Sequence, residues 1–290
     1  MKKPLVIAEI GCNHKGDFEI AKELIDLAHN CGAHVAKFQK RNPKELLTED
    51  QYKAAHPNPH NSYGDSYGQH REFLEFDLNQ HRLLKEYCDS IGIKYSTSTW
   101  DVTSAEEIVS LNPDFIKVPS ACNNHFEMLK VLRDNYSGEV HISFGMTTKP
   151  EEEEIVSFFE ETSSAKERLI LYSCTSGYPV PFEDVCLLEI SRIKEKFGTR
   201  VKNIGFSGHH LGIAIDIAAY TLGAVWIERH FTKDRTWKGT DHAASLEPSG
   251  FEKLVRNLNA THTALSYKNK DILSIEDVQR AKLKFRAKTS

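Results

Sequence analysis

Two short stretches of the sequence decide the fold, SGHH at 207–210 and ERHF at 228–231. Each follows a run typical of a β-strand, 201–206 before the first and 224–228 before the second, and a helical stretch separates them. This order predicts a β-α-β unit, whose two strands are parallel. One histidine, His209 or His230, therefore stands at the same end of each strand. Two neighbouring imidazoles at the mouth of a barrel predict a divalent metal site.

The rest of the chain repeats this alternation. Further strands are predicted at 5–9, 33–39, 94–97, 115–118, 140–144 and 169–173, and helical stretches separate them. Eight strand–helix units predict an α/β fold, a single-domain (β/α)8 TIM barrel over residues 1–270, and 290 residues suit that size. The rival is an open doubly wound sheet, which is disfavoured as a nucleotide-binding fold because no G-x-G-x-x-G follows the first strand.

Two segments fall outside the alternation. The stretch 41–74 shows no clear period and follows the second strand, so it is predicted to be a long loop at the barrel mouth. Its many aromatic residues favour a packed lid. Residues 271–290 are predicted to be a C-terminal tail or the start of a linker to another domain.

The composition excludes several classes of protein. A net charge of −4 gives no electrostatic basis for binding nucleic acid, and the chain has no run of ~18 apolar residues to cross a membrane. The apolar N-terminus is broken at Glu9, which favours a strand over a signal peptide. The six cysteines form no C-x-x-C pair, so free thiols and a cytoplasmic location are expected.

Several charged residues are predicted to meet at the carboxyl ends of the strands, where such barrels place their chemistry. Lys37 and Lys117 follow apolar strand residues and should point inward, and buried lysines are rare unless they are paired. Together with nearby serines they predict a pocket for a phosphate and a carboxylate. Taken alone, either lysine reads more readily as a surface residue. The convergence of lysines, histidines and acids favours a site.

Seven motifs, in order from Ile7 to about Lys284, make this sequence similar to the sialic acid (nonulosonic acid) synthase family. They are AEIGCNHKG at 8–16, KFQK at 37–40, IKVPS at 116–120 followed by NN at 123–124, CTSGYP at 174–179, GFSGH at 205–209, ERHFT at 228–232 and TWKGTDH at 236–242. The last segments look most like the sialic acid 9-phosphate synthase type.

The resemblance implies a transferase of carbohydrate biosynthesis, active as a cytoplasmic homodimer. It would condense phosphoenolpyruvate with an N-acyl hexosamine, either N-acetylmannosamine or its 6-phosphate, to give a sialic acid-type nonulosonic acid and phosphate. The implied cofactor is Mn2+, with Mg2+ or Co2+ as alternatives, held by His209 and His230.

The resemblance also assigns roles to residues. Glu228 would lie near the metal ion and its water, and Glu9, Asp241 and Lys117 would join it in catalysis. The residues implied to bind phosphoenolpyruvate are Lys37, Lys117, Ser120, Ser176 and Ser207. Those implied to bind the sugar are Glu9, Gln39, Tyr67, Tyr178 and Asp241.

Two departures from the family pattern stand out. Many members carry an acidic residue where this chain has Cys122. Members also carry a C-terminal antifreeze-like domain that sends an arginine into the partner's site, and this chain stops about where the linker would begin. Tyr67, His70 and Arg71 are candidates to replace that arginine. Two alternatives stay open: a related phosphoenolpyruvate-condensing barrel that uses a neutral sugar or sugar phosphate, and a catalytically inactive barrel that binds sugar phosphate.

Overall fold

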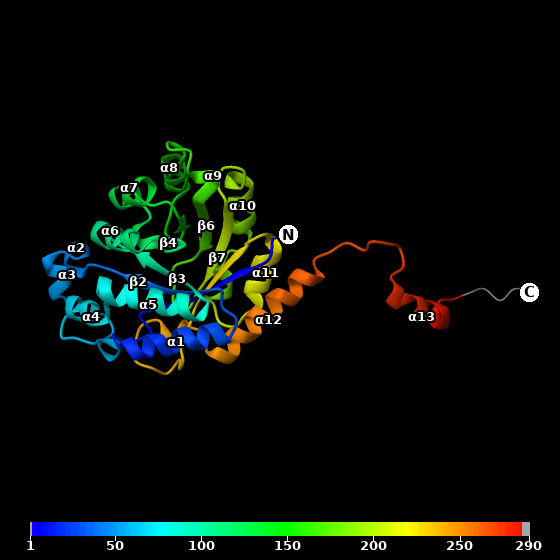
Figure 1. The fold of residues 1–290 in the computed structure, drawn as a ribbon, viewed down its shortest axis with the longest axis horizontal. Helices are drawn as coiled ribbons and strands as arrows, with labels where there is room; N and C mark the ends of the chain where they lie inside the picture. Colours follow the sequence, from blue (N-terminus) through cyan, green and yellow to red (C-terminus); the bar gives the residue numbers. More distant parts are fainter. Residues whose placement is uncertain (1, 286–290) are drawn as a thin grey trace, which may run out of the picture.

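The computed structural model describes residues 2–285 and contains a closed parallel barrel whose strands follow chain order from β1 to β8 (Figure 1). The strands are β1 Leu5–Gly11, β2 Val35–Lys40, β3 Lys94–Thr99, β4 Phe115–Val118, β5 Glu139–Ser143, β6 Leu169–Cys174, β7 Asn203–Gly208 and β8 Trp226–His230. The barrel closes where β1 pairs with β8, with Glu9 beside His230. The predicted (β/α)8 barrel is confirmed.

Helices connect successive strands and cover the outside of the barrel (Figure 1). The main ones are α1 Phe18–Asn30, α5 Leu78–Ile91, α6 Val102–Leu111, α7 Phe126–Asp134, α8 Lys149–Glu160, α10 Leu188–Phe197, α11 Ala214–Leu222 and α12 Pro248–Ala264. Capping interactions define the ends of these helices. Helix α5, for example, starts at a capping box between Asp77 and Gln80 and ends at Gly92, whose φ of 83° completes a left-handed cap.

The segment 41–74 is more ordered than its irregular pattern predicts. It folds into four short helices, which are α2 Pro43–Leu46, α3 Glu49–Lys53, η1 Pro59–Asn61 and α4 Tyr67–Leu74. Capping boxes start α3 at Thr48 and α4 at Ser66, where each side chain accepts a hydrogen bond from the backbone three residues on. The remaining short elements are η2 Ser120–Cys122, α9 Ala165–Arg168, η3 Phe182–Asp184 and η4 His242–Ala244.

Helix α13 (Ser274–Leu283) is separate from the barrel. It buries no residue, and Figure 1 shows it beyond α12 at the end of an extended connection. The apolar side chains of Ile275 and Leu283 are accordingly exposed. The barrel core is complete without this helix.

The barrel interior is built in layers, because alternate residues of each strand point inward. One layer is apolar and comes from the even-numbered strands: Val35, Phe115, Tyr172 and Trp226. The inward positions two residues further along the same strands hold Lys37, Lys117, Cys174 and Glu228. The apolar layer therefore forms the base on which a charged layer rests at the carboxyl end of the barrel.

A buried ionic cluster joins strand β8 and helix α11 to the loop that follows β7. The Arg229 guanidinium pairs with the Asp216 carboxylate at 2.6 Å and also donates to the His210 carbonyl oxygen at 2.6 Å. The His210 ring lies 3.2 Å from Asp216 and is fully buried. His210 therefore helps to fix the loop that carries His209.

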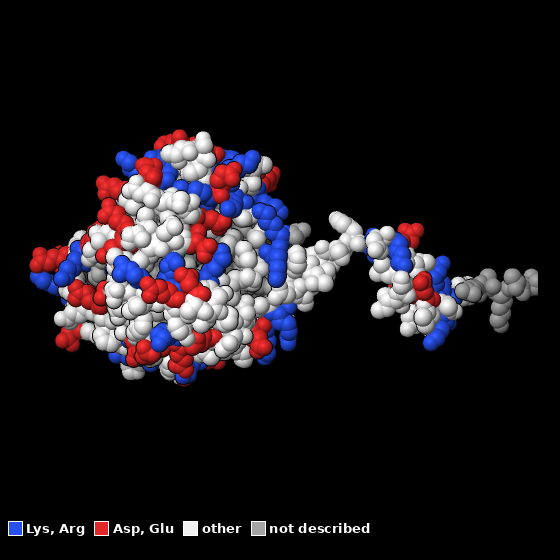
Figure 2. Space-filling view, viewed as in Figure 1, with Lys and Arg blue, Asp and Glu red and all other residues white. Residues whose placement is uncertain are grey.

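The surface shows mixed charge. Figure 2 shows Lys and Arg interspersed with Asp and Glu over the visible face of the barrel. No helix among residues 2–285 combines the length and the apolar character needed to span a membrane. All six cysteines are free.

We predict that Asp216→Asn lowers the free energy of unfolding by about 3–5 kcal/mol, because it leaves the buried Arg229 cation without its partner. Urea denaturation followed by circular dichroism measures this. Asp89→Asn is the matched control, since Asp89 pairs with Lys85 at the surface and is 57% exposed. Its expected effect is about 0.5 kcal/mol or less. Equal effects of the two substitutions would contradict the structural role of the cluster.

Candidate active site

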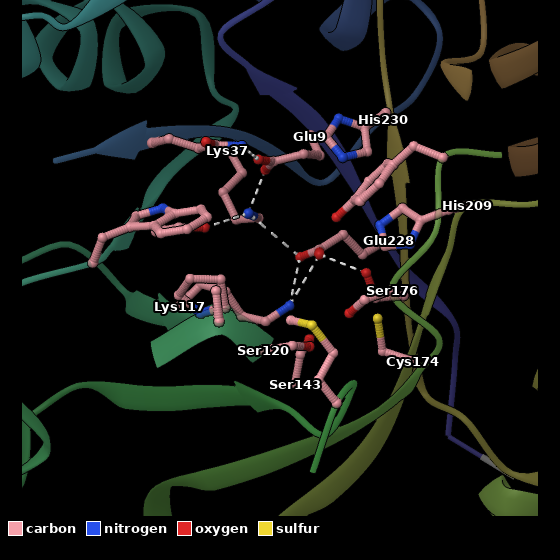
Figure 3. Close-up of a pocket in the computed structure, with 18 residues that line it drawn as sticks. Glu9, Lys37, Lys117, Ser120, Ser143, Cys174, Ser176, His209, Glu228 and His230 are labelled. Carbon is pink, nitrogen blue, oxygen red and sulfur yellow. Dashed lines mark hydrogen bonds and ion pairs between the residues drawn. The ribbon is translucent and has the colours of Figure 1, made fainter. Parts of the chain in front are cut away.

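A cavity of about 320 Å3 opens at the carboxyl end of the barrel. It gathers all of the predicted site residues except Tyr67 and Asp241: Glu9, Lys37, Gln39, Lys117, Ser120, Ser176, Tyr178, Ser207, His209, Glu228 and His230. These residues come from six of the strands and the loops that follow them, and Figure 3 shows the charged groups turned toward one another.

The floor of the cavity is a network of four buried charges. Lys117 Nζ contacts both carboxylate oxygens of Glu228 at 3.0 Å. Lys37 Nζ forms an ion pair with Glu9, lies 3.6 Å from Glu228 and donates to Ser98 Oγ at 2.8 Å (Figure 3). All four charged side chains are at least 92% buried. The expectation that both lysines point inward is therefore confirmed, and each has the partner that burial demands.

Ion pairing sets the charge of Glu228 and Lys37, whereas burial, with a smaller effect of Lys37, lowers the pKa of Lys117 in spite of Glu228. Burial by itself would raise the pKa of Glu228, but the Lys117 and Lys37 ammonium groups outweigh it and hold that pKa well below its ordinary value. Burial likewise would lower the pKa of Lys37, and the Glu228 and Glu9 carboxylates reverse the effect and raise it. Glu228 is therefore an anion and Lys37 a cation at neutral pH.

Hydroxyl groups line the wall beside this floor. Ser207 Oγ donates to Glu228 at 2.9 Å, and Ser120 Oγ accepts from the backbone N–H of Gly145 at 3.0 Å. A side chain at Gly145 would not fit, because a Cβ there would lie 2.5 Å from Ser176 Oγ and 2.6 Å from Ser120 Oγ. The glycine therefore lets two serines from different loops meet at one edge of the cavity.

The two histidines lie side by side across the cavity from the two lysines, with ring centroids 5.5 Å apart (Figure 3). His209 Nδ1 lies 3.0 Å from the Thr175 carbonyl oxygen, so Nδ1 carries the hydrogen and Nε2 keeps a free lone pair. Burial, reinforced by His230, lowers the pKa of His209 to about 4, so the ring is neutral. His230 Nδ1 is buried without a hydrogen-bond partner in the described chain.

This donor set fits a divalent metal ion with two protein ligands. Neutral imidazoles with free nitrogen lone pairs suit Mn2+, Co2+ or Zn2+. Across residues 2–285, no three or more His, Cys, Asp or Glu side chains gather as a metal site. An ion held by His209 and His230 would therefore complete its coordination with water and substrate oxygens, as open catalytic sites do.

Two predicted sugar-binding residues lie outside the cavity lining. Asp241 is near enough to His230 to respond to it: burial alone would raise the pKa of Asp241, whereas His230 and then Arg71 lower it. Tyr67 lines a neighbouring cavity together with Arg71 and Cys122. His70 lines neither cavity; it is buried within the segment 41–74, where its Nδ1 accepts from the Tyr63 N–H at 3.1 Å.

The cavity also contains residues that the sequence did not single out. Ser98, Trp100, Ser143 and Met146 all contribute to its lining. Ser98 and Ser143 stand on inward positions at strand ends and share the signal that identified Ser207. Trp100 and Met146 follow the strands in loops, where no local pattern indicates which way a side chain points.

Fold and cavity together define a (β/α)8 barrel with a polar, buried site at the carboxyl end of its strands. The sequence model of the NeuB family matches residues 24–270. N-acetylneuraminate-9-phosphate synthase from Homo sapiens is 38% identical over 278 residues, which is 96% of this chain and 76% of that protein. The chain belongs to the NeuB family.

Two other relatives extend the comparison. N,N'-diacetyllegionaminic acid synthase from Campylobacter jejuni is 32% identical over 265 residues, covering 91% of this chain and 78% of that protein. The crystal structure of N-acetylneuraminic acid (sialic acid) synthetase from Leptospira borgpetersenii, in complex with citrate, is similar with a TM-score of 0.81 at 28% identity. That similarity covers 98% of this chain and 94% of the other.

We predict that the stabilising effect of the Glu228 charge disappears in acid. The pKa of Glu228 in the folded protein lies below the ordinary value of 4.5, so its stabilisation is complete above about pH 4.5 and declines as the pH falls further. The difference in unfolding free energy between wild type and Glu228→Gln should shrink by about 1.4 kcal/mol for each pH unit below that point.

Urea denaturation of both proteins at neutral pH and at two pH values below 4.5 measures this slope. A second comparison with Glu154→Gln, an exposed glutamate on α8, controls for the general effect of acid. A difference that stays constant across the series would mean that Glu228 gains nothing from its two lysines.

Proposed function

We propose that this protein condenses phosphoenolpyruvate with an N-acyl hexosamine, N-acetylmannosamine or its 6-phosphate, to give a nonulosonic acid and phosphate, and that the reaction needs a divalent metal ion, most readily Mn2+. One observation carries the proposal: a buried lysine pair and a histidine pair face each other across a single cavity. The names of the relatives, synthases of sialic and legionaminic acids, support the same class of product.

Phosphoenolpyruvate suits the floor and the serine wall of the cavity. Its phosphate and carboxylate need fixed cationic and hydroxyl donors, and Lys37 and Lys117 supply the cations. Ser120, Ser176 and Ser207 supply the hydroxyls beside them. Because these side chains are held by ion pairs and hydrogen bonds before substrate arrives, they orient the enol carbon without reorganising.

The sugar suits the histidine side of the cavity. The bound metal ion would supply Lewis-acid polarisation of the open-chain aldehyde. Gln39 Nε2 donates to Glu9 Oε1 at 3.0 Å, which fixes the amide that can bind sugar hydroxyls. The Tyr178 ring lies 4.3 Å from the His209 ring and is 53% exposed, so it forms a wall at the entrance.

The reaction balances as follows. Carbon 3 of phosphoenolpyruvate forms a bond to the aldehyde carbon of the sugar, and the aldehyde oxygen takes up a proton. Carbon 2 becomes electron-poor, a water oxygen bonds to it, and the water loses a proton. The carbon–oxygen bond to phosphate then breaks, phosphate leaves with the bonding electron pair, and the hydroxyl on carbon 2 gives up its remaining proton to the departing phosphate. The product keeps a ketone at carbon 2.

The four charged residues of the floor have distinct roles in these reaction steps. The Glu228 carboxylate, ionised and buried near carbon 2, stabilises positive charge that develops there. Glu9, paired with Lys37, is the second carboxylate available to accept a proton from the water. Lys117 and Lys37 offset the charge that grows on the departing phosphate. No nucleophilic residue is needed, and Cys174 does not offer one, since burial raises the pKa of its thiol to about 11.

Two alternative functions can be compared with this site. A related condensing barrel with a neutral sugar would need the same lysines and histidines and differs only in the sugar. A catalytically inactive barrel would have little need for two adjacent imidazoles, one of them with a free Nε2 lone pair, beside an ion-paired floor. The homodimer and the cytoplasmic location stay predictions.

We predict that phosphate is released from phosphoenolpyruvate only when Mn2+ and an N-acyl hexosamine are both present. The assay pairs phosphate detection with mass spectrometry, and it runs N-acetylmannosamine, its 6-phosphate and mannose in parallel. A nine-carbon or longer keto acid should appear in proportion to phosphate. Phosphate release that does not depend on any sugar, or no release at all, would contradict the proposed reaction.

We also predict that His209→Ala and His230→Ala each abolish turnover and weaken Mn2+ binding by roughly 100-fold or more, because each removes one of two protein ligands. Isothermal titration with Mn2+ measures binding independently of activity. His29→Ala is the control, since His29 is exposed at the end of α1. Unchanged Mn2+ affinity in both site variants would contradict the assignment of the metal site.

A further inference from the structure

A second cavity of about 210 Å3 adjoins the candidate active site. We call it the side pocket; it is lined by Arg41, Tyr67, Arg71, Trp100 and Ala121, together with apolar residues of α2 and Cys122. Trp100 and Ala121 also line the active-site cavity, so the two spaces share a wall. The side pocket is therefore directly adjacent to the candidate active site, with Trp100 and Ala121 at the boundary between them.

The wall that the side pocket shares with the main cavity lies across the barrel mouth from the histidines. Trp100 follows β3 and Ala121 follows β4, whereas His209 follows β7 and His230 ends β8. In a closed barrel with strand order β1 to β8, β3 and β4 stand opposite β7 and β8. A sugar whose aldehyde lies at the histidines would therefore extend its other end toward the side pocket.

Of the two arginines in the side pocket, one is paired with a carboxylate and the other is not. Arg41 forms an ion pair with Glu75, Nε to Oε1, at 2.8 Å. Arg71 donates from Nε and Nη2 to the Tyr67 hydroxyl, at 3.0 and 2.6 Å, and has no carboxylate at ion-pair distance within residues 2–285. The side pocket therefore keeps one cation that forms no ion pair with any carboxylate among the described residues.

Arg71 is half-buried and its guanidinium orientation is set before any ligand binds. The two bonds to Tyr67 hold the planar fork, and the same tyrosine ring lies 5.0 Å from the guanidinium carbon. Burial has the largest effect on the pKa of Asp241 and would raise it. His230 lowers that pKa, and Arg71 and Arg41 lower it further. Arg71 is thus electrostatically coupled to the histidine side of the site.

We propose that the side pocket binds a phosphate carried on the last carbon of the sugar substrate, and that Arg71 is the residue that makes the enzyme prefer the phosphorylated sugar. This rests on the proposed function and specifies its substrate. A guanidinium in a fixed orientation binds phosphate oxygens in pairs, and the apolar walls around it strengthen that attraction. The last carbon is the end of the open-chain sugar furthest from the aldehyde, as the position of the side pocket requires.

The test compares kcat/KM for N-acetylmannosamine 6-phosphate and for N-acetylmannosamine. Wild type should favour the phosphorylated sugar, and Arg71→Met should reduce that preference by roughly 10- to 100-fold. Arg71→Lys keeps the charge and should restore part of the preference. Arg256→Met, at an exposed position of α12, should leave it unchanged. A preference that Arg71→Met does not alter would overturn the proposal.

A binding measurement separates this proposal from the proposed reaction. Calorimetry with N-acetylmannosamine 6-phosphate, in the presence of phosphoenolpyruvate and without metal ion, needs no turnover. Weaker binding to Arg71→Met than to wild type, with Tyr67→Phe less affected, supports the phosphate site even if no product forms. Equal affinities of wild type and Arg71→Met would overturn the phosphate site even if the synthase reaction is observed.

Discussion

The need to neutralise two buried lysines shapes the rest of this site. Lys37 and Lys117 stand on inward positions of β2 and β4, directly above a mainly apolar layer that offers no carboxylate, although Lys117 Nζ lies 3.9 Å from the Tyr172 ring centroid. An unpaired ammonium group there would be strongly destabilising, and Glu9 on β1 and Glu228 on β8 supply the carboxylates that pair with the two lysines. The closed barrel meets this demand because it brings the first and last strands side by side.

Because the two glutamates neutralise the two lysines, the floor alone is a weak anion site. Two ammonium groups and two carboxylates sum to no net charge, whereas phosphoenolpyruvate carries a phosphate and a carboxylate. In the proposed enzyme, a divalent ion at His209 and His230 adds the missing positive charge at one edge of the cavity. Arg71 adds another at the opposite edge, outside the floor. Charge is thus distributed around a neutral centre, where the carbon–carbon bond would form.

Much of this arrangement could be predicted from the sequence, because the end of a strand can be recognised from the few residues around it. Alternating strand–helix patterns predict the barrel. A parallel barrel places the carboxyl ends of all its strands at one mouth. The charged residues at those ends were therefore predicted to converge, as Lys37, Lys117, His209 and Glu228 do. The segment 41–74 was harder, since its helices are too short to show a period. The capping pairs Thr48–Gln51 and Ser66–Gln69 were the available signal. The shared wall formed by Trp100 depends on how loops pack and has no local signature.

The central claim is that the buried lysine pair holds phosphoenolpyruvate, and calorimetric titration of phosphoenolpyruvate in the presence of Mn2+ tests it most directly. Wild type and Lys130→Met, a change at an exposed position of α7, should bind alike. Lys117→Met should bind roughly 10- to 100-fold more weakly, because a charge-assisted contact to the ligand is lost. Equal affinity in all three proteins would contradict the account.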